Sequence, residues 1–234
     1  MNLSDFREDY QHGSLDLAQL HPNPFVQFEL WFQEATGEKS QSRWRKICVA
    51  LVKLWSALCN HRPADINAMT LATVDKNGRP SSRTVLLKTV DERGFIFFTN
   101  YDSRKGRELT ENPHAALTFF WPELERQVCV AGSVTKLSTA ESEKYFQSRP
   151  RGSQIGAWAS HQSEVVLDRA TLEKQWHELE QKFPGAVPLP PNWGGFILSP
   201  ARIEFWQGRP SRLHDRLQYA RQTDGSWKLE RLAP

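Results

Sequence analysis

Basic side chains gather in one short stretch of the sequence, residues 83–105 (RTVLLKTVDERGFIFFTNYDSRK). Arg83 and Lys88 flank an apolar run that predicts a β-strand. Arg104 and Lys105 follow Ser103, which is a good helix N-cap. Cations in the first turn of a helix oppose the helix dipole, whereas the free N–H groups there favour a phosphate. The stretch therefore predicts an anion site, and a solvated basic edge is the alternative.

Two anionic groups are expected, because a regular strand cannot aim Arg83 and Lys88 at one group. Alternate side chains of a strand point to opposite faces, and these two residues are five apart. Converging donors of the kind that a phosphate needs fall into two sets. The first set is Arg83, Arg104 and Lys105, and the second is Lys88, Tyr145, Arg149 and Ser153.

A second basic run, RLHDR, occupies residues 212–216. On a strand, Arg212, His214 and Arg216 would alternate onto one face. A row of like charges is costly unless an anionic or electron-rich group lies over it, although an edge that faces water is the alternative. Trp206 precedes this run and could stack on a planar ring.

Several common classes of site are absent from the sequence. It contains no GxGxxG, GxxxxGK[ST], HExxH or GxSxG motif, and its histidines and cysteines show no metal-ligand spacing, so no metal is expected. With 30 Lys and Arg against 27 Asp and Glu, the net charge of +3 does not call for nucleic acid. No apolar run approaches the ~20 residues that span a bilayer. We expect a cytoplasmic protein that does not bind membranes.

The scaffold that positions these side chains is expected to be mainly β with flanking helices (α+β). Residues 1–24 lack periodicity and predict an N-terminal arm. A helix is expected to begin at Phe25 and end near Gly37, and residues 36–62 predict a charged loop and a second amphipathic helix. Residues 25–234 are expected to form a single domain.

Short antiparallel strands with tight turns favour a barrel for the remaining chain. Asn77-Gly78 is a strong hairpin signal, and Ser138 with Glu141 fits a capping box for a helix over residues 139–148. We expect Ser153 and residues 160–163 in the loop beyond that helix. A long helix should then precede three or four strand-like runs over residues 193–234, one of which carries RLHDR.

Several long motifs make the chain resemble the pyridoxamine (pyridoxine) 5′-phosphate oxidase family. They keep the family's order over residues 65–234, with a weaker match over residues 5–35. The matching runs are RTVLLK at 83, FFTN and SRK at 97–105, ERQV at 125, KYFQSRPRGSQIGAWAS at 144–160, WGGF at 193, EFWQG at 204, RLHDR at 212 and the final ERLAP.

This resemblance implies an FMN-binding split β-barrel and a homodimer with FMN at the subunit interface. It also implies oxidation of pyridoxine 5′-phosphate and pyridoxamine 5′-phosphate to pyridoxal 5′-phosphate, with O2 reduced to H2O2. Carried over by position, the FMN contacts are Arg83, Thr84, Val85, Leu86, Leu87, Lys88, Phe98, Thr99, Arg104, Lys105, Gln127, Gln162, Ser163, Trp206 and Arg216. The contacts to the substrate phosphate are Lys88, Tyr145, Arg149 and Ser153.

The resemblance further assigns Arg212 and His214 to the substrate ring. Asp65 and His214 are candidates for proton handling, and Arg7 and Tyr10 would act as a mobile lid over the substrate. Hydride transfer to the flavin and reoxidation by O2 would be the cofactor's chemistry, while the protein positions the two rings.

Two departures from the family pattern stand out. Residues 36–62 look like an insertion, which makes the placement of Asp65 and the arm less direct, and Phe98 stands where a tyrosine is common. Two other functions remain open alternatives at this stage. One is a split-barrel flavoprotein reductase with a different reductant, and the other is a non-catalytic carrier of FMN or pyridoxal phosphate.

Overall fold

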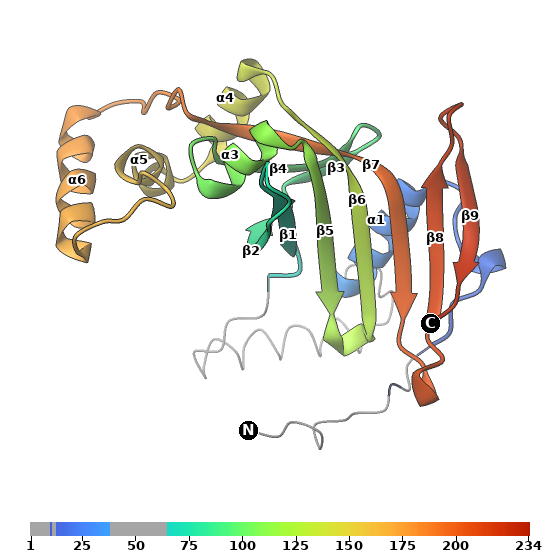
Figure 1. The fold of residues 1–234 in the computed structure, drawn as a ribbon. Helices are drawn as coiled ribbons and strands as arrows, with labels where there is room; N and C mark the ends of the chain where they lie inside the picture. The colour runs from blue at the N-terminus through green and yellow to red at the C-terminus, as the bar shows by residue number, and fades with distance from the viewer. Residues whose placement is uncertain (1–9, 11–12, 38–64) are drawn as a thin grey trace, which may run out of the picture. The chain divides into compact units, whose positions relative to one another are not determined.

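The computed structural model describes residue 10, residues 13–37 and residues 65–234 (Figure 1). Arg7 and nearly all of the predicted insertion at 36–62 lie outside the described residues, so those predictions stay predictions. The chain divides into two compact units. Unit 1 comprises Met1–Thr70, Leu117–Ala131 and Pro200–Pro234, and unit 2 comprises Leu71–Ala116 and Gly132–Ser199.

The fold is dominated by strands. They are β1 (Ala68–Val74), β2 (Pro80–Leu86), β3 (Thr89–Asp91), β4 (Gly94–Asn100), β5 (His114–Trp121), β6 (Arg126–Lys136), β7 (Trp193–Gln207), β8 (Asp215–Arg221) and β9 (Trp227–Leu232). Their hydrogen-bonded order is β2-β1-β5-β6-β7-β4-β3, and β8 pairs with both β7 and β9. The pairings β3–β4, β4–β7, β7–β8 and β8–β9 are antiparallel. The prediction of a mainly β fold with flanking helices is confirmed.

Helices flank the strands in both units. They are α1 (Pro24–Thr36), α3 (Arg104–Glu111), α4 (Thr139–Ser148), α5 (Arg151–Ala159) and α6 (Arg169–Lys182). Short 3-10 turns cover Leu17–Gln19, Pro122–Leu124 and Pro210–Arg212. Within the part of the chain that the structure describes, we find no helix with the length and apolar character that a bilayer crossing requires.

Unit 1 packs α1 through large aromatic side chains. Asn23 caps the helix, and Gly37 ends it in the left-handed conformation, with φ 76°. Phe28 and Trp31 are buried on one face of the helix. The Phe28 ring lies 5.0 Å from that of Phe119 and the Trp31 ring lies 5.0 Å from that of Phe205, both edge-on. The predicted helix over residues 25–37 therefore exists and owes its position to this apolar face.

Unit 2 contains a hairpin of β3 and β4 whose second strand pairs with the first half of β7. Gly94 adopts φ +150° at the turn, where a Cβ would lie only 2.0 Å from the Leu198 carbonyl oxygen. Phe95 and Phe97 of β4 are fully buried, whereas Phe98 on the opposite face is half-buried. The register pairs Phe98 with Gly195, so the aromatic ring has room on the face away from the core.

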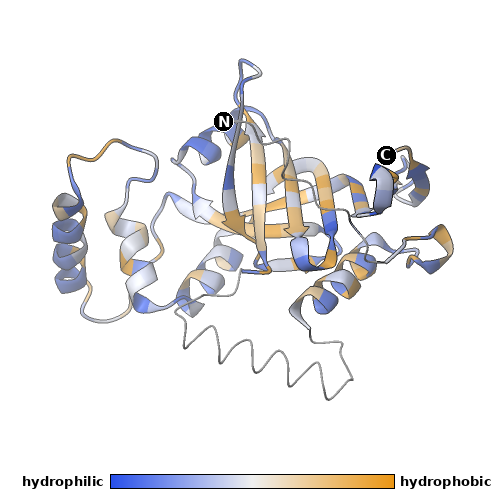
Figure 2. Cartoon of the chain, turned by 90° about the horizontal axis from the view of Figure 1, so that it is seen from below, coloured by the Kyte–Doolittle hydropathy of each residue, from blue (hydrophilic) through white to orange (hydrophobic). Residues whose placement is uncertain are grey.

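A second core in unit 2 lies under α4, α5 and α6. Its buried members are Phe146, Ile155, Val187 and Trp193, and Trp176 of α6 packs against them. Helix α4 begins with the predicted capping box of Ser138 and Glu141. Figure 1 shows α5 beside α6, and Figure 2 colours α6 as largely hydrophilic, which agrees with its lack of a fully buried residue.

Local predictions for two functional segments are wrong. Ser153 lies in α5, not in a loop, because Pro150 ends one helix and directly precedes the next. In the RLHDR run, Arg212 belongs to the 3-10 turn and His214 to the loop after it, so of the three basic residues Arg216 alone lies in β8. Ser211 adopts φ 57° and Arg212 adopts φ 61°, conformations that a continuous strand excludes. The expected row of three basic residues on one strand face does not form.

Candidate functional site

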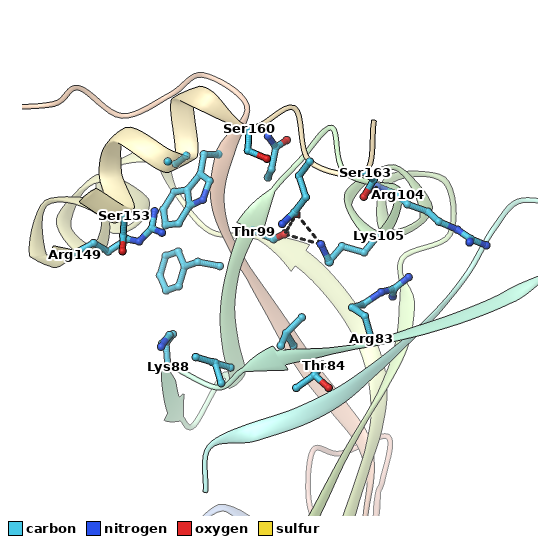
Figure 3. Close-up of a pocket in the computed structure, with 18 of the residues that line it drawn as sticks. Arg83, Thr84, Lys88, Thr99, Arg104, Lys105, Arg149, Ser153, Ser160 and Ser163 are labelled. Atoms are coloured by element: carbon cyan, nitrogen blue, oxygen red, sulfur yellow. Dashed lines mark hydrogen bonds between the residues drawn. The ribbon is translucent and has the colours of Figure 1, made fainter. Parts of the chain in front are cut away.

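A pocket of about 920 Å³ lies within unit 2. Its walls come from β2, β4, the start of α3, the α4–α5 junction and residues 160–163 (Figure 3). The predicted FMN contacts that line it are Arg83, Thr84, Val85, Leu86, Lys88, Phe98, Thr99, Arg104, Lys105, Gln162 and Ser163. The predicted substrate contacts Lys88, Tyr145, Arg149 and Ser153 line it as well. This volume falls within the range of a small-molecule site.

Its basic side chains separate into two groups (Figure 3). Arg83, Arg104 and Lys105 lie toward one end of the pocket, whereas Arg149 lies toward the other together with Lys88. The parity argument that led to two anion sites assumed a regular strand as far as Lys88. Strand β2 ends at Leu86, so that premise fails, although both groups of cations are present in one pocket.

Lys105 forms the floor of the first end, which we call the α3 end and define by Arg83, Arg104 and Lys105. The residue is 7% exposed, and its ammonium group donates to Thr99 Oγ1 at 3.1 Å and to Gln162 Oε1 at 2.8 Å. Burial, together with the smaller effect of the Arg83 charge, lowers the pKa of Lys105 to about 8. A buried ammonium with neutral hydrogen-bond acceptors gains from a nearby anion.

The first turn of α3 adds backbone donors at this end. The Ser103 hydroxyl accepts a hydrogen bond from the Gly106 N–H at 3.3 Å and so caps the helix, as predicted. The Arg104 N–H donates to Ser163 Oγ at 3.2 Å, which holds the loop after α5 against the helix start. The α3 end therefore combines a helix N-terminus with three cations, a combination suited to a phosphate.

A carboxylate that the sequence analysis did not single out joins the two arginines of the α3 end. Glu108 Oε2 lies 3.2 Å from Arg83 Nη2, and Glu108 Oε1 lies 2.8 Å from Arg104 Nε. The spacing of Arg104 and Glu108, four residues apart on a helix, is the signal that could have found it. Burial alone would raise the pKa of the Glu108 carboxyl, but hydrogen bonds from Ser81, Thr73 and the two arginines lower it to about 2.

The second end, which we call the Arg149 end and define by Lys88, Tyr145, Arg149 and Ser153, has a different character. Arg149 Nη1 is buried and meets no hydrogen-bond acceptor among the residues that the structure describes. The guanidinium lies over the Trp193 ring, with Cζ 4.7 Å from its centroid, and burial lowers the pKa of Arg149. A buried guanidinium nitrogen without an acceptor is costly, so this end favours an anionic ligand.

A stack of three aromatic rings supports the Arg149 end. The Phe98 and Tyr145 rings lie 3.9 Å apart with an interplanar angle of 20°, and the Phe98 and Trp193 rings lie 5.5 Å apart at 14°. Phe98 thus supplies packing that any aromatic side chain at this position would supply. The departure from the family's tyrosine leaves the stack in place.

Other predicted site residues are not among those that line the pocket. Leu87 is buried in the core, and Gln127 is half-buried on β6, while Asp65 is exposed before β1. Arg216 pairs with Glu204 at 2.9 Å in unit 1. Arg212 is exposed in its 3-10 turn.

Aromatic and imidazole rings cluster in unit 1. The His214 ring lies 4.7 Å from that of Trp206, and Tyr10 approaches both rings edge-on at 5.5 and 5.8 Å. His214 Nδ1 accepts a hydrogen bond from the Arg209 N–H at 3.1 Å. In the neutral ring this places the proton on Nε2, which leaves a donor available. Among the described residues, no three His, Cys, Asp or Glu side chains are grouped as metal ligands.

Comparisons with known families agree with this geometry. Residues 59–183 match the family model described as pyridoxamine 5′-phosphate oxidase. Residues 193–234 match the model described as the pyridoxine 5′-phosphate oxidase C-terminal dimerisation region. The pocket residues of β2, β4 and α3 through residue 163 fall within the first match, and Trp206 through Arg216 fall within the second.

Full-length relatives carry the same family name. The chain is 54% identical over 233 residues to pyridoxine/pyridoxamine 5′-phosphate oxidase 1 of Ralstonia nicotianae, with 100% of this chain and 99% of the relative covered. It is 53% identical over 234 residues to the pyridoxine/pyridoxamine 5′-phosphate oxidase of Burkholderia mallei, with 99% of both chains covered.

Two solved structures share the fold. PhzG from Burkholderia lata 383, solved with tetrahydrophenazine-1-carboxylic acid, aligns with a TM-score of 0.70 at 37% identity over 80% of this chain and 92% of that one. A pyridoxamine 5′-phosphate oxidase-related, FMN binding protein from Nostoc punctiforme aligns with a TM-score of 0.60 at 20% identity, over 83% and 99% of the two chains. Both agree with the predicted split barrel. With two family models and full-length relatives in accord, this chain belongs to the pyridoxine/pyridoxamine 5′-phosphate oxidase family of enzymes.

Proposed function

We propose that this enzyme binds FMN and oxidises pyridoxine 5′-phosphate and pyridoxamine 5′-phosphate to pyridoxal 5′-phosphate, with O2 reduced to H2O2. The observation that carries the proposal is one pocket with separate cationic groups at its two ends. A flavin mononucleotide and a phosphorylated pyridine each bring one phosphate ester, so together they need two such groups.

FMN fits the α3 end. Arg83, Arg104 and Lys105 would bind its phosphate together with the N–H groups at the start of α3. Thr99 donates a hydrogen bond to Gln162, and Ser163 accepts one from the Arg104 N–H. All three side chains lie at this end and would contribute polar contacts to FMN. The other FMN contacts in the proposal are Thr84, Val85, Leu86, Leu87, Lys88, Phe98, Gln127, Trp206 and Arg216.

The vitamer phosphate fits the Arg149 end. An incoming phosphate oxygen would give Arg149 Nη1 the acceptor that the protein does not supply. Tyr145 and Ser153 offer hydroxyl donors on the adjoining helices, and Lys88 adds a second cation. The two ends would hold their phosphates apart, so the two rings can share the space between them.

The residues of the α3 end would hold FMN, which would supply the hydride acceptor for the exocyclic carbon of the substrate and the route for two electrons to O2. The protein residues would orient the substrate and handle protons. Arg212 would orient the pyridine ring, and His214, a candidate for proton handling, would donate a hydrogen bond to the substrate through Nε2–H. Asp65 is a second candidate for proton handling, and Arg7 and Tyr10 would cover the bound substrate.

We further propose a homodimer with FMN at the subunit interface. Support comes from the match of residues 193–234 to a dimerisation region.

The strained backbone of Arg212 supports a functional role for its loop, because a non-glycine residue with φ 61° costs of order 1 kcal/mol and persists only where the surroundings enforce it. Location in the cytoplasm stays a prediction from the sequence.

A spectrum and a turnover assay test the function together. Purified enzyme should carry a flavin absorption band that bleaches when pyridoxine 5′-phosphate is added without oxygen, and in air the mixture should form pyridoxal 5′-phosphate and H2O2. Unphosphorylated pyridoxine should give far less bleaching at the same concentration, because the Arg149 end would then lack its ligand. Yellow protein without turnover would instead establish a flavin carrier.

The Arg212→Ala variant separates the two roles in the proposal. Loss of the side chain that orients the ring should lower kcat by about 10²–10³-fold while the flavin content stays unchanged. Arg83→Ala serves as the matched comparison, since it should lower flavin retention. Equal flavin loss in both variants would overturn the assignment of Arg212 to the substrate.

A further inference from the structure

Glu108 is buried behind the α3 end of the pocket and does not itself line it. A buried carboxylate that neutralises cations at an anion site looks counterproductive, because it competes with the ligand for the same donors. Its contacts argue for another role. Both of its carboxylate oxygens accept hydrogen bonds. Oε2 accepts from Thr73, Ser81 and Arg83, and Oε1 accepts from Arg104.

The hydrogen bonds around Glu108 have a fixed direction. Thr73 Oγ1 and Ser81 Oγ donate to Glu108 Oε2 at 2.5 and 2.6 Å. With their protons committed to the carboxylate, these hydroxyls present lone pairs to Arg83, whose Nη1 donates to Thr73 and whose Nη2 donates to Ser81, both at 2.5 Å. The carboxylate therefore sets the orientation of both hydroxyls and holds the Arg83 guanidinium in one plane.

The same carboxylate also anchors the second guanidinium. Glu108 Oε1 accepts from Arg104 Nε at 2.8 Å, and among the described residues no hydrogen bond engages the terminal nitrogens of Arg104, which are left for a ligand. The Arg104 side chain is 60% exposed, and an exposed arginine without such an anchor would sample many rotamers. Each carboxylate oxygen serves one arginine, and an amide could replace only one of the two acceptors.

Glu108 also balances the charge around Lys105. Arg83, Arg104 and Lys105 with Glu108 amount to three cations and one carboxylate, a formal charge of +2 that matches a phosphate dianion. Without the carboxylate, the buried Lys105 would face Arg83 with less compensation and would lose its proton more readily.

We propose that Glu108 is a positioning residue that aligns Arg83 and Arg104 and keeps Lys105 charged, so that the α3 end selects a flavin carrying a phosphate over one without it. The inference rests on the proposed function, because it takes FMN as the ligand of this end. Glu108 acts through the cations and touches no ligand itself.

Affinities for FMN and riboflavin measure this role, because the two flavins differ only in the phosphate. Apo-enzyme prepared from wild type and from Glu108→Gln would be titrated with each flavin by fluorescence quenching. We expect the ratio of the riboflavin Kd to the FMN Kd to fall by about 10- to 100-fold in the variant, since charge-assisted hydrogen bonds to the phosphate are lost. Riboflavin binding should change by less than about threefold.

Two opposite results would overturn the proposal. If Glu108 merely repelled the phosphate, Glu108→Gln would bind FMN more tightly than wild type. If Glu108 were only structural, both flavins would weaken together and their ratio would stay constant. Glu111→Gln is the matched control, because it removes an exposed carboxylate from the same helix, and its ratio should equal that of wild type.

A second variant tests the alignment without changing charge. Thr73→Val removes one hydroxyl relay between Glu108 and Arg83, and Thr73 does not line the pocket. Its ratio should fall in the same direction by about threefold, in line with one neutral hydrogen bond. An unchanged ratio would contradict the relay even if Glu108→Gln failed to fold. Failure of wild type to prefer FMN over riboflavin would instead refute the proposed function.

Discussion

At the α3 end of the pocket the guanidinium groups already have a partner within the protein, whereas at the Arg149 end one buried guanidinium nitrogen has none among the described residues. Both ends are cationic and both lie in unit 2, so composition alone does not distinguish them. The difference is whether the protein fixes its donors before a ligand arrives.

This difference suits two ligands with different residence times. At the α3 end, Glu108 and the hydroxyls hold the arginines in place, so less entropy is lost when a phosphate binds. At the Arg149 end, burial of an unpaired donor raises the energy of the free pocket, and an anion relieves it. A preformed site fits a cofactor that stays bound, while a site with an unmet donor fits a substrate that exchanges.

The largest effect expected from this comparison comes from Arg149→Ala. Removal of the guanidinium should raise KM for pyridoxine 5′-phosphate by about 30- to 150-fold, from about 2–3 kcal/mol of lost charge-assisted hydrogen bonds. Flavin content should stay at the wild-type level, because FMN is assigned to the other end. Steady-state kinetics in air and the flavin absorbance of the purified protein measure the two quantities.

Arg169→Ala is the control for Arg149→Ala. This arginine begins α6, its side chain is 88% exposed, and its Nε pairs with Glu173 four residues along. Its removal should leave both KM and flavin content unchanged. If Arg149→Ala lost flavin in proportion to its loss of turnover, the two ends would not be separate sites.

Sequence reasoning identified most of the residues that line the pocket because their motifs are long and contiguous. Ser103 as an N-cap, the Asn77-Gly78 turn and the Ser138–Glu141 capping box depend on local backbone chemistry, and the structure has all three. Interactions within a few residues along the chain are the kind that a single sequence reveals.

Contacts between distant residues escaped the sequence analysis. Thr73, Ser81 and Arg83 meet Glu108 across a separation of 25 to 35 residues, which no pattern in one sequence encodes. The prediction that Arg212, His214 and Arg216 share one strand face was wrong for another reason. Strand periodicity was applied to residues 212–214, whereas Pro210 and the positive φ of Ser211 place them in a turn.

The comparison also predicts a smaller effect, a dependence of FMN affinity on pH that arises at the α3 end alone. Because burial lowers the pKa of Lys105 to about 8, below its usual value of 10.5, the free enzyme has lost about half of this charge at pH 8 and most of it at pH 9. FMN needs the charged form, so its Kd should rise by about tenfold between pH 7 and pH 9. Fluorescence titration across this range measures the change.

The stability of the apo-enzyme should increase with pH over a range in which its affinity for FMN decreases. Between pH 8 and 10.5 the unfolded chain holds the Lys105 proton more tightly than the folded chain does, so this residue makes the free energy of unfolding rise with pH. Lys105→Met should bind FMN more weakly at pH 7 and remove both trends. A Kd that rose equally in Lys105→Met and in wild type would assign the pH dependence to another group.

The smallest effect concerns the ring stack that supports the Arg149 end. Phe98 lies against Tyr145 and Trp193, and Trp193 in turn carries the Arg149 guanidinium. Phe98→Leu keeps an apolar side chain but removes the stacking, which should lower the free energy of unfolding by about 1 kcal/mol. Because Tyr145 and Arg149 would then be less well held, KM for pyridoxine 5′-phosphate should rise about threefold. Phe98→Tyr keeps the ring and should match wild type in both quantities. If instead Phe98→Leu weakened FMN binding and left KM unchanged, the stack would belong to the cofactor, and the division between a fixed end and an exchanging end would have to be drawn elsewhere in the pocket.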